Sequence, residues 1–145
     1  MKWDRRFLDV AETVSTWSKD PSTKVGAVIV DAKRRILGTG YNGFPRGIED
    51  SPDRYADREH KYAHVVHAEM NAILNATRDL DGCALYLWQL PPCSHCAKHI
   101  IQSGIARVIA RAGARPHRWA DDFSVSIRML REAGITYSEV EVVDF

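Results

Sequence analysis

The sequence predicts an α/β protein in which helices pack on a central sheet. Segments with the periodicity of amphipathic helices alternate with short apolar runs typical of buried strands over most of the 145 residues. The length is that of one domain, and the composition, 45% hydrophobic and 27% charged, is that of a globular protein with a core. No internal repeat and no linker interrupts the pattern, so we expect a single domain over residues 1–145.

The first half of the chain is expected to form one helix and two strands. Apolar residues at steps of three or four predict a helix over residues 4–20, which the following proline ends. Continuous or near-continuous apolar runs predict strands over 24–31 and 34–43, joined as a hairpin. Residues 42–64 are rich in glycine, proline and charge, so we expect a long functional loop with one helical turn.

The second half alternates helices and strands more regularly. Asp81–Gly82 is a turn dipeptide, and glycines at 104 and 134 mark the ends of two helices. The expected elements are a helix over 67–79, a strand over 83–88, a helix over 94–104, a strand over 106–112, a helix over 120–134 and a strand over 135–143. This order is that of an α/β layered domain.

Charge and hydropathy exclude several classes of protein. The net charge of +1 gives no overall attraction to nucleic acid or to a membrane surface. The charged start "MKWDRRFLDV" lacks the apolar core of a signal peptide, and the longest aliphatic run, Val25–Val30, is too short to span a bilayer. We therefore expect a cytoplasmic protein without a membrane partner.

Two cysteines and one histidine have the spacing of metal ligands. Cys93 and Cys96 stand at i and i+3 at the expected start of a helix, where two thiolates can bind one ion. His67 starts another helix and supplies an imidazole, which is a good ligand for zinc. Three protein ligands leave a fourth tetrahedral position for water, which is typical of a catalytic zinc.

Glu69 gives this group a catalytic interpretation. It stands two residues after His67, close to the expected metal but not needed as a ligand. Zinc lowers the pKa of a coordinated water to about 7, and a neighbouring carboxylate can take the proton of that water and pass it to a substrate. The pattern therefore predicts that Glu69 moves protons.

Less specific interpretations of the same residues remain open. Cys93 and Cys96 alone could be a redox pair or half of a structural zinc knuckle, and His99 could complete a closed site with His67. A closed site would leave Glu69 without a function. Cys83 and His95 are expected to be a small core residue and a solvent-facing residue, and not ligands.

The sequence around these residues resembles that of a known family. "HAEMNAI" and "PPCSHCAKHI" match the H-A-E and P-C-x-x-C signature of the zinc-dependent cytidine and deoxycytidylate deaminases. The resemblance covers roughly residues 24–108. It implies a three-layer α/β/α domain with a mixed sheet of about five strands and helices on both faces, and one zinc per chain held by His67, Cys93 and Cys96 with Glu69 as the catalytic residue.

Within this family the chain resembles the deoxycytidylate (dCMP) deaminases. The stretches "SKDPSTKVGAVIVD" and "GYNGFPRG" carry this likeness. It implies hydrolysis of dCMP to dUMP and ammonia, which supplies dUMP for thymidylate synthesis. The substrate residues that it implies are Asn42, Lys24, Ala68 and Arg115, with a basic group of the segment "RAGARPHRW" (Arg111, Arg115, His117, Arg118) on the 5′-phosphate.

The resemblance also implies regulation and assembly. Some dCMP deaminases are hexamers regulated by dCTP and dTTP, so Tyr41, Asn42, Gly43 and Arg46 are candidate effector residues and a hexamer or dimer is expected. No further cysteine pair is available for a second, structural zinc. Where the family carries a tyrosine that packs on the nucleotide, this chain has alanine and glycine around Ala114, and Trp119 or Trp88 would have to replace it.

Other functions share the same zinc core. The chain could deaminate another cytosine nucleotide or a nucleoside. A transfer-RNA adenosine deaminase would need a basic docking surface that a net charge of +1 does not indicate. A non-enzymatic zinc module is the remaining class.

Overall fold

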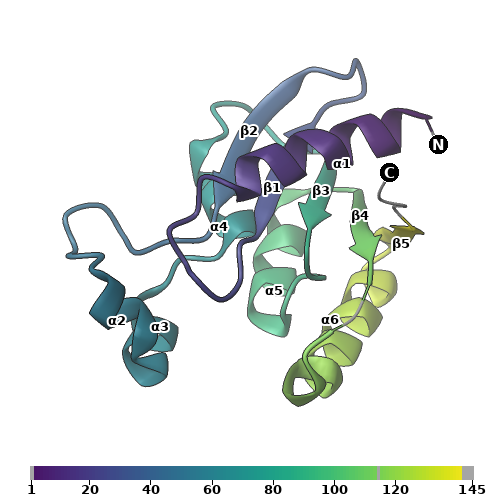
Figure 1. Ribbon diagram of the computed structural model, residues 1–145. Helices are drawn as coiled ribbons and strands as arrows, with labels where there is room; N and C mark the ends of the chain where they lie inside the picture. The colour runs from purple at the N-terminus through teal and green to yellow at the C-terminus, as the bar shows by residue number, and fades with distance from the viewer. Residues whose placement is uncertain (1, 114, 142–145) are drawn as a thin grey trace.

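The centre of the fold is a mixed five-stranded sheet in the order β2-β1-β3-β4-β5. The computed structural model describes residues 2–113 and 115–141 (Figure 1). The strands are β1 (Gly26–Val30), β2 (Ile36–Tyr41), β3 (Ala84–Trp88), β4 (Arg107–Ala112) and β5 (Thr136–Glu141). Strand β1 runs antiparallel to both β2 and β3, whereas β3, β4 and β5 are parallel.

Helices cover both faces of this sheet. Helix α1 (Lys2–Ser15) packs on one face through Phe7, Leu8, Ala11 and Val14. The other face carries α4 (Ala68–Asn75), α5 (Ser94–Ser103) and α6 (Ala120–Glu132), whose apolar side chains form a second core cluster with the sheet. The predicted three-layer α/β/α architecture of five strands is confirmed.

Strand direction brings the start of β1 and the ends of β2, β3 and β4 to the same side of the sheet. Gly26, the first residue of β1, pairs with Tyr41 at the end of β2 and with Trp88 at the end of β3. Because β4 is parallel to β3, it ends on the same side of the sheet. The loops that lead into α4, α5 and α6 therefore start from this side, where the strands end, and we call it the metal edge.

Two glycines of β2 allow α4 to lie close to the sheet. A Cβ atom on Gly38 or Gly40 would overlap the backbone of α4 at Ala68 and Ala72. Both positions therefore need glycine for the close approach of the helix backbone. This contact fixes the height of α4 above β2 and so the place of the residues at its N-terminus.

The long loop contains more helix than the sequence predicts. Residues 42–64 include α2 (Pro52–Ala56) and α3 (Arg58–His64), which lie apart from the sheet in Figure 1. Asp57 caps α3 by accepting a hydrogen bond from the His60 backbone N–H. The predicted single helical turn was wrong because short helices of this kind carry no apolar periodicity. A 3₁₀ turn, η1 (His117–Trp119), precedes α6.

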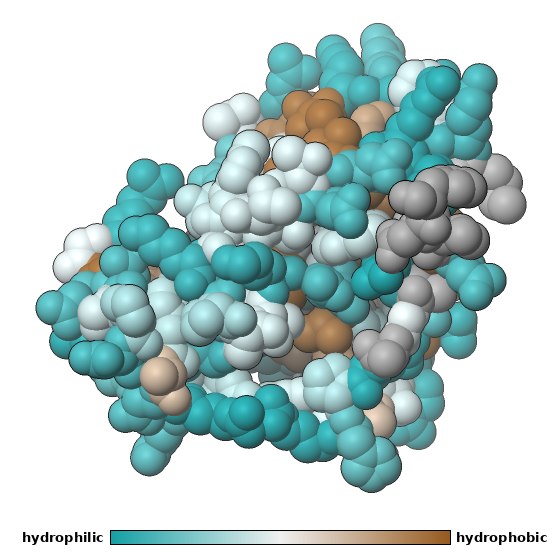
Figure 2. All heavy atoms as spheres, in the orientation of Figure 1, coloured by the Kyte–Doolittle hydropathy of each residue, from teal (hydrophilic) through white to brown (hydrophobic). Residues whose placement is uncertain are grey.

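Other boundaries differ by a few residues. Helix α1 ends at Ser15 and α4 at Asn75, both earlier than predicted, and β5 is described to Glu141. None of the helices within residues 2–113 and 115–141 is long and apolar enough to cross a membrane. Hydrophilic side chains dominate the face shown in Figure 2, and apolar ones show in only a few places.

Candidate active site

The predicted metal ligands meet at the N-termini of two neighbouring helices. His67 is the N-cap residue of α4, and Cys93 is the N-cap residue of α5. Cys96 lies in the first turn of α5 and is fully buried, whereas Cys93 is half-buried and His67 is exposed. Both helices start at the metal edge, so their positive ends point to the same region, where they favour thiolates.

The three ligand atoms lie close enough together to bind one metal ion. His67 Nδ1 lies 3.2 Å from Cys96 Sγ and 3.5 Å from Cys93 Sγ, and all three atoms lie within 4.8 Å of one another. Tetrahedral bonds of about 2.0–2.3 Å would separate such ligands by roughly 3.5 Å. Two thiolates and one imidazole are ligands that zinc prefers, and among the described residues no other group of three such side chains meets.

Mutual contacts shift the pKa values of the three groups in opposite directions. A hydrogen bond from the Cys96 thiol lowers the pKa of Cys93 to about 4, with His67 adding to the effect. The hydrogen bond with Cys93 in turn raises the pKa of His67 to about 9. The pKa of Cys96 is raised, first by Cys93 and then by burial. Without a metal these groups therefore share protons, which metal binding would release.

Glu69 lies in the first turn of α4, behind the three ligands. Only 4% of the residue is exposed, and no side chain of the described residues donates a hydrogen bond to its carboxylate. Burial raises the pKa of Glu69 to about 7, although the neighbouring His67 opposes the shift. A carboxyl group with such a pKa can both accept and return a proton near neutrality.

Polar side chains of α4 tie this helix to the end of β2. Asn71 Nδ2 donates to the Tyr41 carbonyl at 2.8 Å, and Asn75 Nδ2 donates to the Thr39 carbonyl at 2.9 Å. Gly43 and Val66 form an isolated backbone bridge just before His67. These contacts hold α4 against β2, and only the H-A-E-x-N spacing, which ends at Asn71, could have indicated them.

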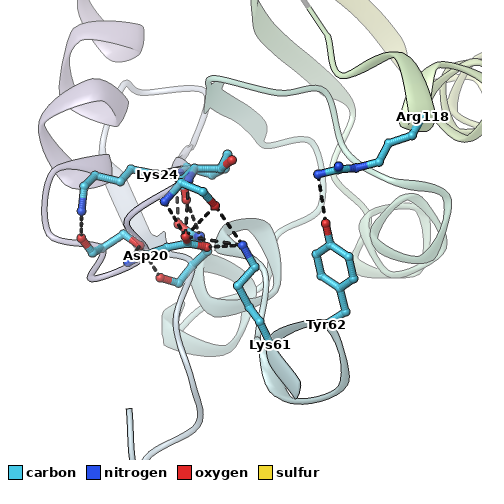
Figure 3. Close-up of polar contacts among 10 residues, drawn as sticks. Asp20, Lys24, Lys61, Tyr62 and Arg118 are labelled. Carbon is cyan, nitrogen blue, oxygen red and sulfur yellow. Dashed lines mark hydrogen bonds and ion pairs between the residues drawn. The ribbon is translucent and has the colours of Figure 1, made fainter. Parts of the chain in front are cut away.

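Asn42 is buried in a polar network beside the metal edge. Its side chain accepts from the Val25 N–H at 2.9 Å and donates to the Thr23 carbonyl at 2.9 Å and to Asp20 at 3.4 Å. Asp20 also pairs with Lys61 of α3 at 3.2 Å (Figure 3). The amide of Asn42 is thus already bonded within the protein, where it holds the loop before β1.

The predicted basic residues differ in their partners. Lys24 donates to the Ser18 carbonyl, and Arg115 forms an ion pair with Glu139. Arg118 donates to the Tyr62 hydroxyl at 3.1 Å, which connects η1 to α3 (Figure 3).

Two predicted residues lie on the other face of the sheet. Arg111 stacks on Trp88, with its guanidinium carbon 4.6 Å from the ring centroid. Trp88 is buried against α1, so it cannot reach a nucleotide on the side of α4 and α5. Trp119, in contrast, packs edge-on against Tyr62 with ring centroids 5.8 Å apart. The Ala114 position lies outside the described residues.

The remaining predicted residues have simpler surroundings. Ala68 is buried in the core under α4, so only its backbone could meet a substrate. Tyr41 and Arg46 are exposed, and Gly43 is half-buried.

His99 is not part of the metal group, and its Nδ1 contacts the His95 carbonyl at 2.9 Å. The closed structural site is therefore without support. Cys83 is buried, as predicted.

One contact beside the metal group was missed by the sequence analysis. Asp122, in the first turn of α6, accepts two hydrogen bonds from Ser94, the residue that follows Cys93. The two residues are far apart in the chain, and an acidic first turn is common in helices, so no local signal pointed to this pair.

A group of two cysteines and one histidine beside a buried carboxyl group fits a zinc-binding deaminase, and sequence comparison gives the family. A family model described as the cytidine and deoxycytidylate deaminase zinc-binding region matches residues 1–112. The chain therefore belongs to this family, and its His67, Cys93 and Cys96 are positioned to bind a metal ion.

Individual relatives agree with this assignment. The chain is 46% identical over 136 residues to an uncharacterised deaminase of the luxG 3′ region of Aliivibrio fischeri, covering 92% of this chain and 90% of that protein. It is 38% identical over 143 residues to deoxycytidylate deaminase of Homo sapiens, covering 94% and 79%. The apo dCMP deaminase of cyanophage S-TIM5 superimposes with a TM-score of 0.74 at 26% identity, covering 96% and 98%.

Proposed function

We propose that this protein deaminates dCMP hydrolytically, giving dUMP and ammonia. The observation that carries the proposal is the buried Glu69 beside the His67, Cys93 and Cys96 group. Human deoxycytidylate deaminase, at 38% identity, and the cyanophage dCMP deaminase, which has also been solved with dCMP and dUMP, support the choice of substrate. The product dUMP would be available for thymidylate synthesis.

His67, Cys93 and Cys96 would hold one zinc ion. When bound, zinc lowers the pKa of a coordinated water to about 7 and so supplies a nucleophile at neutral pH. An imidazole and two thiolates would leave one ligand position for a water molecule, and the exposure of His67 to solvent suits access of water and substrate. The helix starts of α4 and α5 orient the ligands before any substrate arrives.

Glu69 moves the protons in this proposal. It takes one proton from the attacking water and delivers it to N3 of the cytosine ring as the bond to C4 forms. It then takes the remaining hydroxyl proton and passes it to the amino group, which leaves as ammonia while the C4 carbonyl of dUMP forms. Water and dCMP are thus converted to dUMP and ammonia without any other reactant. Burial of Glu69 suits this function, because a raised pKa lets its carboxylate accept the proton of the water and hold it until N3 takes it.

Arg118 is our candidate for the 5′-phosphate. The guanidinium is exposed and, among the described residues, contacts only the neutral hydroxyl of Tyr62. Lys24 and Arg115 are bonded to a carbonyl and a carboxylate within the protein, so they are less free to bind an anion. Arg118 lies on the segment between β4 and α6, which starts from the metal edge. Asn42 would hold the loop before β1 through its internal hydrogen bonds, and the backbone of Ala68 would face the cytosine ring.

The decisive experiment compares dCMP with deoxycytidine, together with CMP, dCTP and an adenosine-containing RNA, by ammonia release. A charge-assisted phosphate contact contributes about 1.5–3 kcal/mol, which corresponds to a preference of about 10- to 150-fold in kcat/KM for dCMP. Equal values for the two compounds would mean a nucleoside deaminase. The absence of ammonia from every cytosine compound would refute the reaction itself.

The phosphate contact has a matched control on α6. Arg118→Gln should reduce the preference for dCMP over deoxycytidine, whereas Arg128→Gln, which removes an exposed arginine ten residues further along the chain, should leave it unchanged. A preference that survives Arg118→Gln would assign the phosphate to another cation.

We further propose that the protein is a cytoplasmic homo-oligomer, a hexamer or a dimer, under control by dCTP and dTTP. Large exposed apolar side chains on the edge strand β2 and on α4, including Ile36, Tyr41 and Leu74, support assembly. Exposed Tyr41 and Arg46, on either side of Asn42 and Gly43, are the candidate effector residues. Reduced cysteines, which the zinc site needs, suit the cytoplasm.

A further inference from the structure

Helix α5, which carries both thiolate ligands, is held at its first residue by a carboxylate from another helix. Asp122 of α6 accepts a hydrogen bond from the Ser94 backbone N–H at 2.9 Å and a second one from the Ser94 hydroxyl at 2.6 Å. The two carboxylate oxygens therefore each take one donor of the same residue. Both residues are half-buried, so this contact is partly shielded from water.

Ser94 is the residue at which such a contact has the greatest effect on the ligands. It lies directly after Cys93 and two residues before Cys96, so fixing its backbone and side chain fixes the first turn of α5. The free N–H groups of a helix start need acceptors, which the N-cap side chain normally supplies. Here the N-cap residue is Cys93, whose sulfur accepts a hydrogen bond from the Cys96 N–H at 3.4 Å, which leaves the N–H of Ser94 to another acceptor.

The cap that Cys93 provides does not reach the first N–H of the helix. An N-cap side chain bonds the N–H of the second or third helical residue, so the N–H of Ser94, the first residue of α5, needs an acceptor from elsewhere. Asp122 provides one without occupying the position of a ligand. The carboxylate therefore accepts the first N–H of α5 and leaves the sulfur of Cys93 free for the metal.

We propose that Asp122 is a positioning residue of the metal centre, acting through Ser94 to hold Cys93 and Cys96 in the geometry that zinc requires. This inference rests on the zinc site and not on the identity of the substrate. Its measurements therefore remain interpretable if dCMP proves to be the wrong nucleotide. Residues that orient metal ligands in this way typically change metal affinity or activity by about 10- to 100-fold when they are mutated.

The neighbouring residue offers a matched control. Asp121 lies in the same first turn of α6, is exposed, and makes no hydrogen bond to α5 within residues 2–113 and 115–141. Asp121→Ala and Asp122→Ala remove the same charge and the same favourable interaction with the helix dipole. The difference between the two variants therefore reports the contact with Ser94.

The test measures zinc affinity by competition with a chromogenic chelator, and the absorption spectrum of the Co²⁺-substituted protein. Asp122→Ala should weaken zinc binding by about 10- to 100-fold, and it should shift or weaken the cobalt–thiolate bands. Asp121→Ala should leave both within about twofold. A purely structural cap would lower the melting temperature of Asp122→Ala while affinity and spectrum stay those of the wild type, and this result would overturn the proposal.

Graded variants keep the test decisive if Asp122→Ala does not fold. Ser94→Ala removes the hydroxyl contact and keeps the backbone one, whereas Ser94→Thr keeps both donors. Zinc affinity should therefore decrease from the wild type and Ser94→Thr to Ser94→Ala. Wild-type affinity in Ser94→Ala, or a loss in Ser94→Thr as large as in Ser94→Ala, would contradict the mechanism.

Discussion

The two ends of the sheet both bury ionisable side chains, but they do so differently. At the end opposite the metal edge, Tyr86 donates to Asp4 at 2.7 Å, and Arg107 contacts the same carboxylate at 3.4 Å. These residues line a cavity of about 280 Å³ together with Trp3. At the metal edge, Glu69 is as deeply buried, yet none of the described side chains donates to its carboxylate.

Burial raises the pKa at both ends, with different consequences. It raises the pKa of Tyr86 to about 12, with the hydrogen bond to Asp4 adding to the shift, so the phenol stays a neutral donor at any physiological pH. The same cause raises the pKa of Glu69 to about 7, so this carboxyl group can hold or release a proton near neutrality. Paired burial gives a structural contact, whereas unpaired burial of an acid gives a group suited to chemistry.

The largest expected difference between the two ends concerns their cysteines. Cys93→Ser or Cys96→Ser should lose the zinc, about one ion per chain, because three ligands cannot be reduced to two without loss of binding. Cys83→Ala, just before β3 at the opposite end, should keep it, since Cys83 is not part of the metal group. Metal analysis of the purified variants measures this directly. Full zinc content in both serine variants would refute the site.

The next prediction compares two buried ionisable residues, Glu69 and Tyr86. Glu69→Gln keeps the shape of the side chain but removes its titration, so zinc should stay and kcat should fall by more than about 10⁴-fold, beyond the usual effect of one acid–base group. Tyr86→Phe should leave kcat within about twofold while it lowers stability, because its hydrogen bond to charged Asp4 is worth about 1.5 kcal/mol. Steady-state kinetics at equal zinc content separates the two. Turnover near the wild-type rate in Glu69→Gln would mean that another group moves the protons.

The parts of the fold that the sequence predicts are those with local signals. The stop of α5 at Gly104 is confirmed, since this glycine takes the left-handed conformation with φ of 88°. The H-A-E and P-C-x-x-C stretches placed His67, Cys93 and Cys96 at helix starts, and the structure brings them together.

What the sequence did not predict depends on contacts between distant segments. Asp122 and Ser94 are 28 residues apart, and Lys61 and Asp20 are 41 apart, so no period or spacing links them. The candidate phosphate residues were equally ambiguous. Arg115 and Arg118 carry the same charge, but only tertiary structure shows that Arg115 is paired with a carboxylate, whereas Arg118, among the described residues, bonds the hydroxyl of Tyr62.

Asp20, a buried carboxylate beside the metal edge, extends this comparison. Asp20 is as buried as Glu69, but it is paired with Lys61 and accepts hydrogen bonds from Ser22. Burial alone would raise the pKa of Asp20, and the hydrogen bonds from Ser22 and Lys61 outweigh it, so the pKa lies below its usual value. A lowered pKa means that Asp20 stabilises the fold above its ordinary pKa and loses this effect as pH falls through the lowered one.

The smallest and last expected effect is therefore one on stability that depends on pH. Asp20→Asn should lower the free energy of unfolding at pH 7 by about 3 kcal/mol, because it leaves the Lys61 ammonium buried without its counter-charge. The difference from the wild type should stay constant from pH 5 to 8 by urea unfolding with EDTA present, and shrink below about pH 4, as the pH falls toward the lowered pKa of Asp20. Asp50→Asn is the control, because the pair of Asp50 with Lys19 at 2.9 Å is exposed and should matter little. A difference that persists unchanged to pH 3, or an equal loss in Asp50→Asn, would show that the buried pair does not hold α3 at the metal edge.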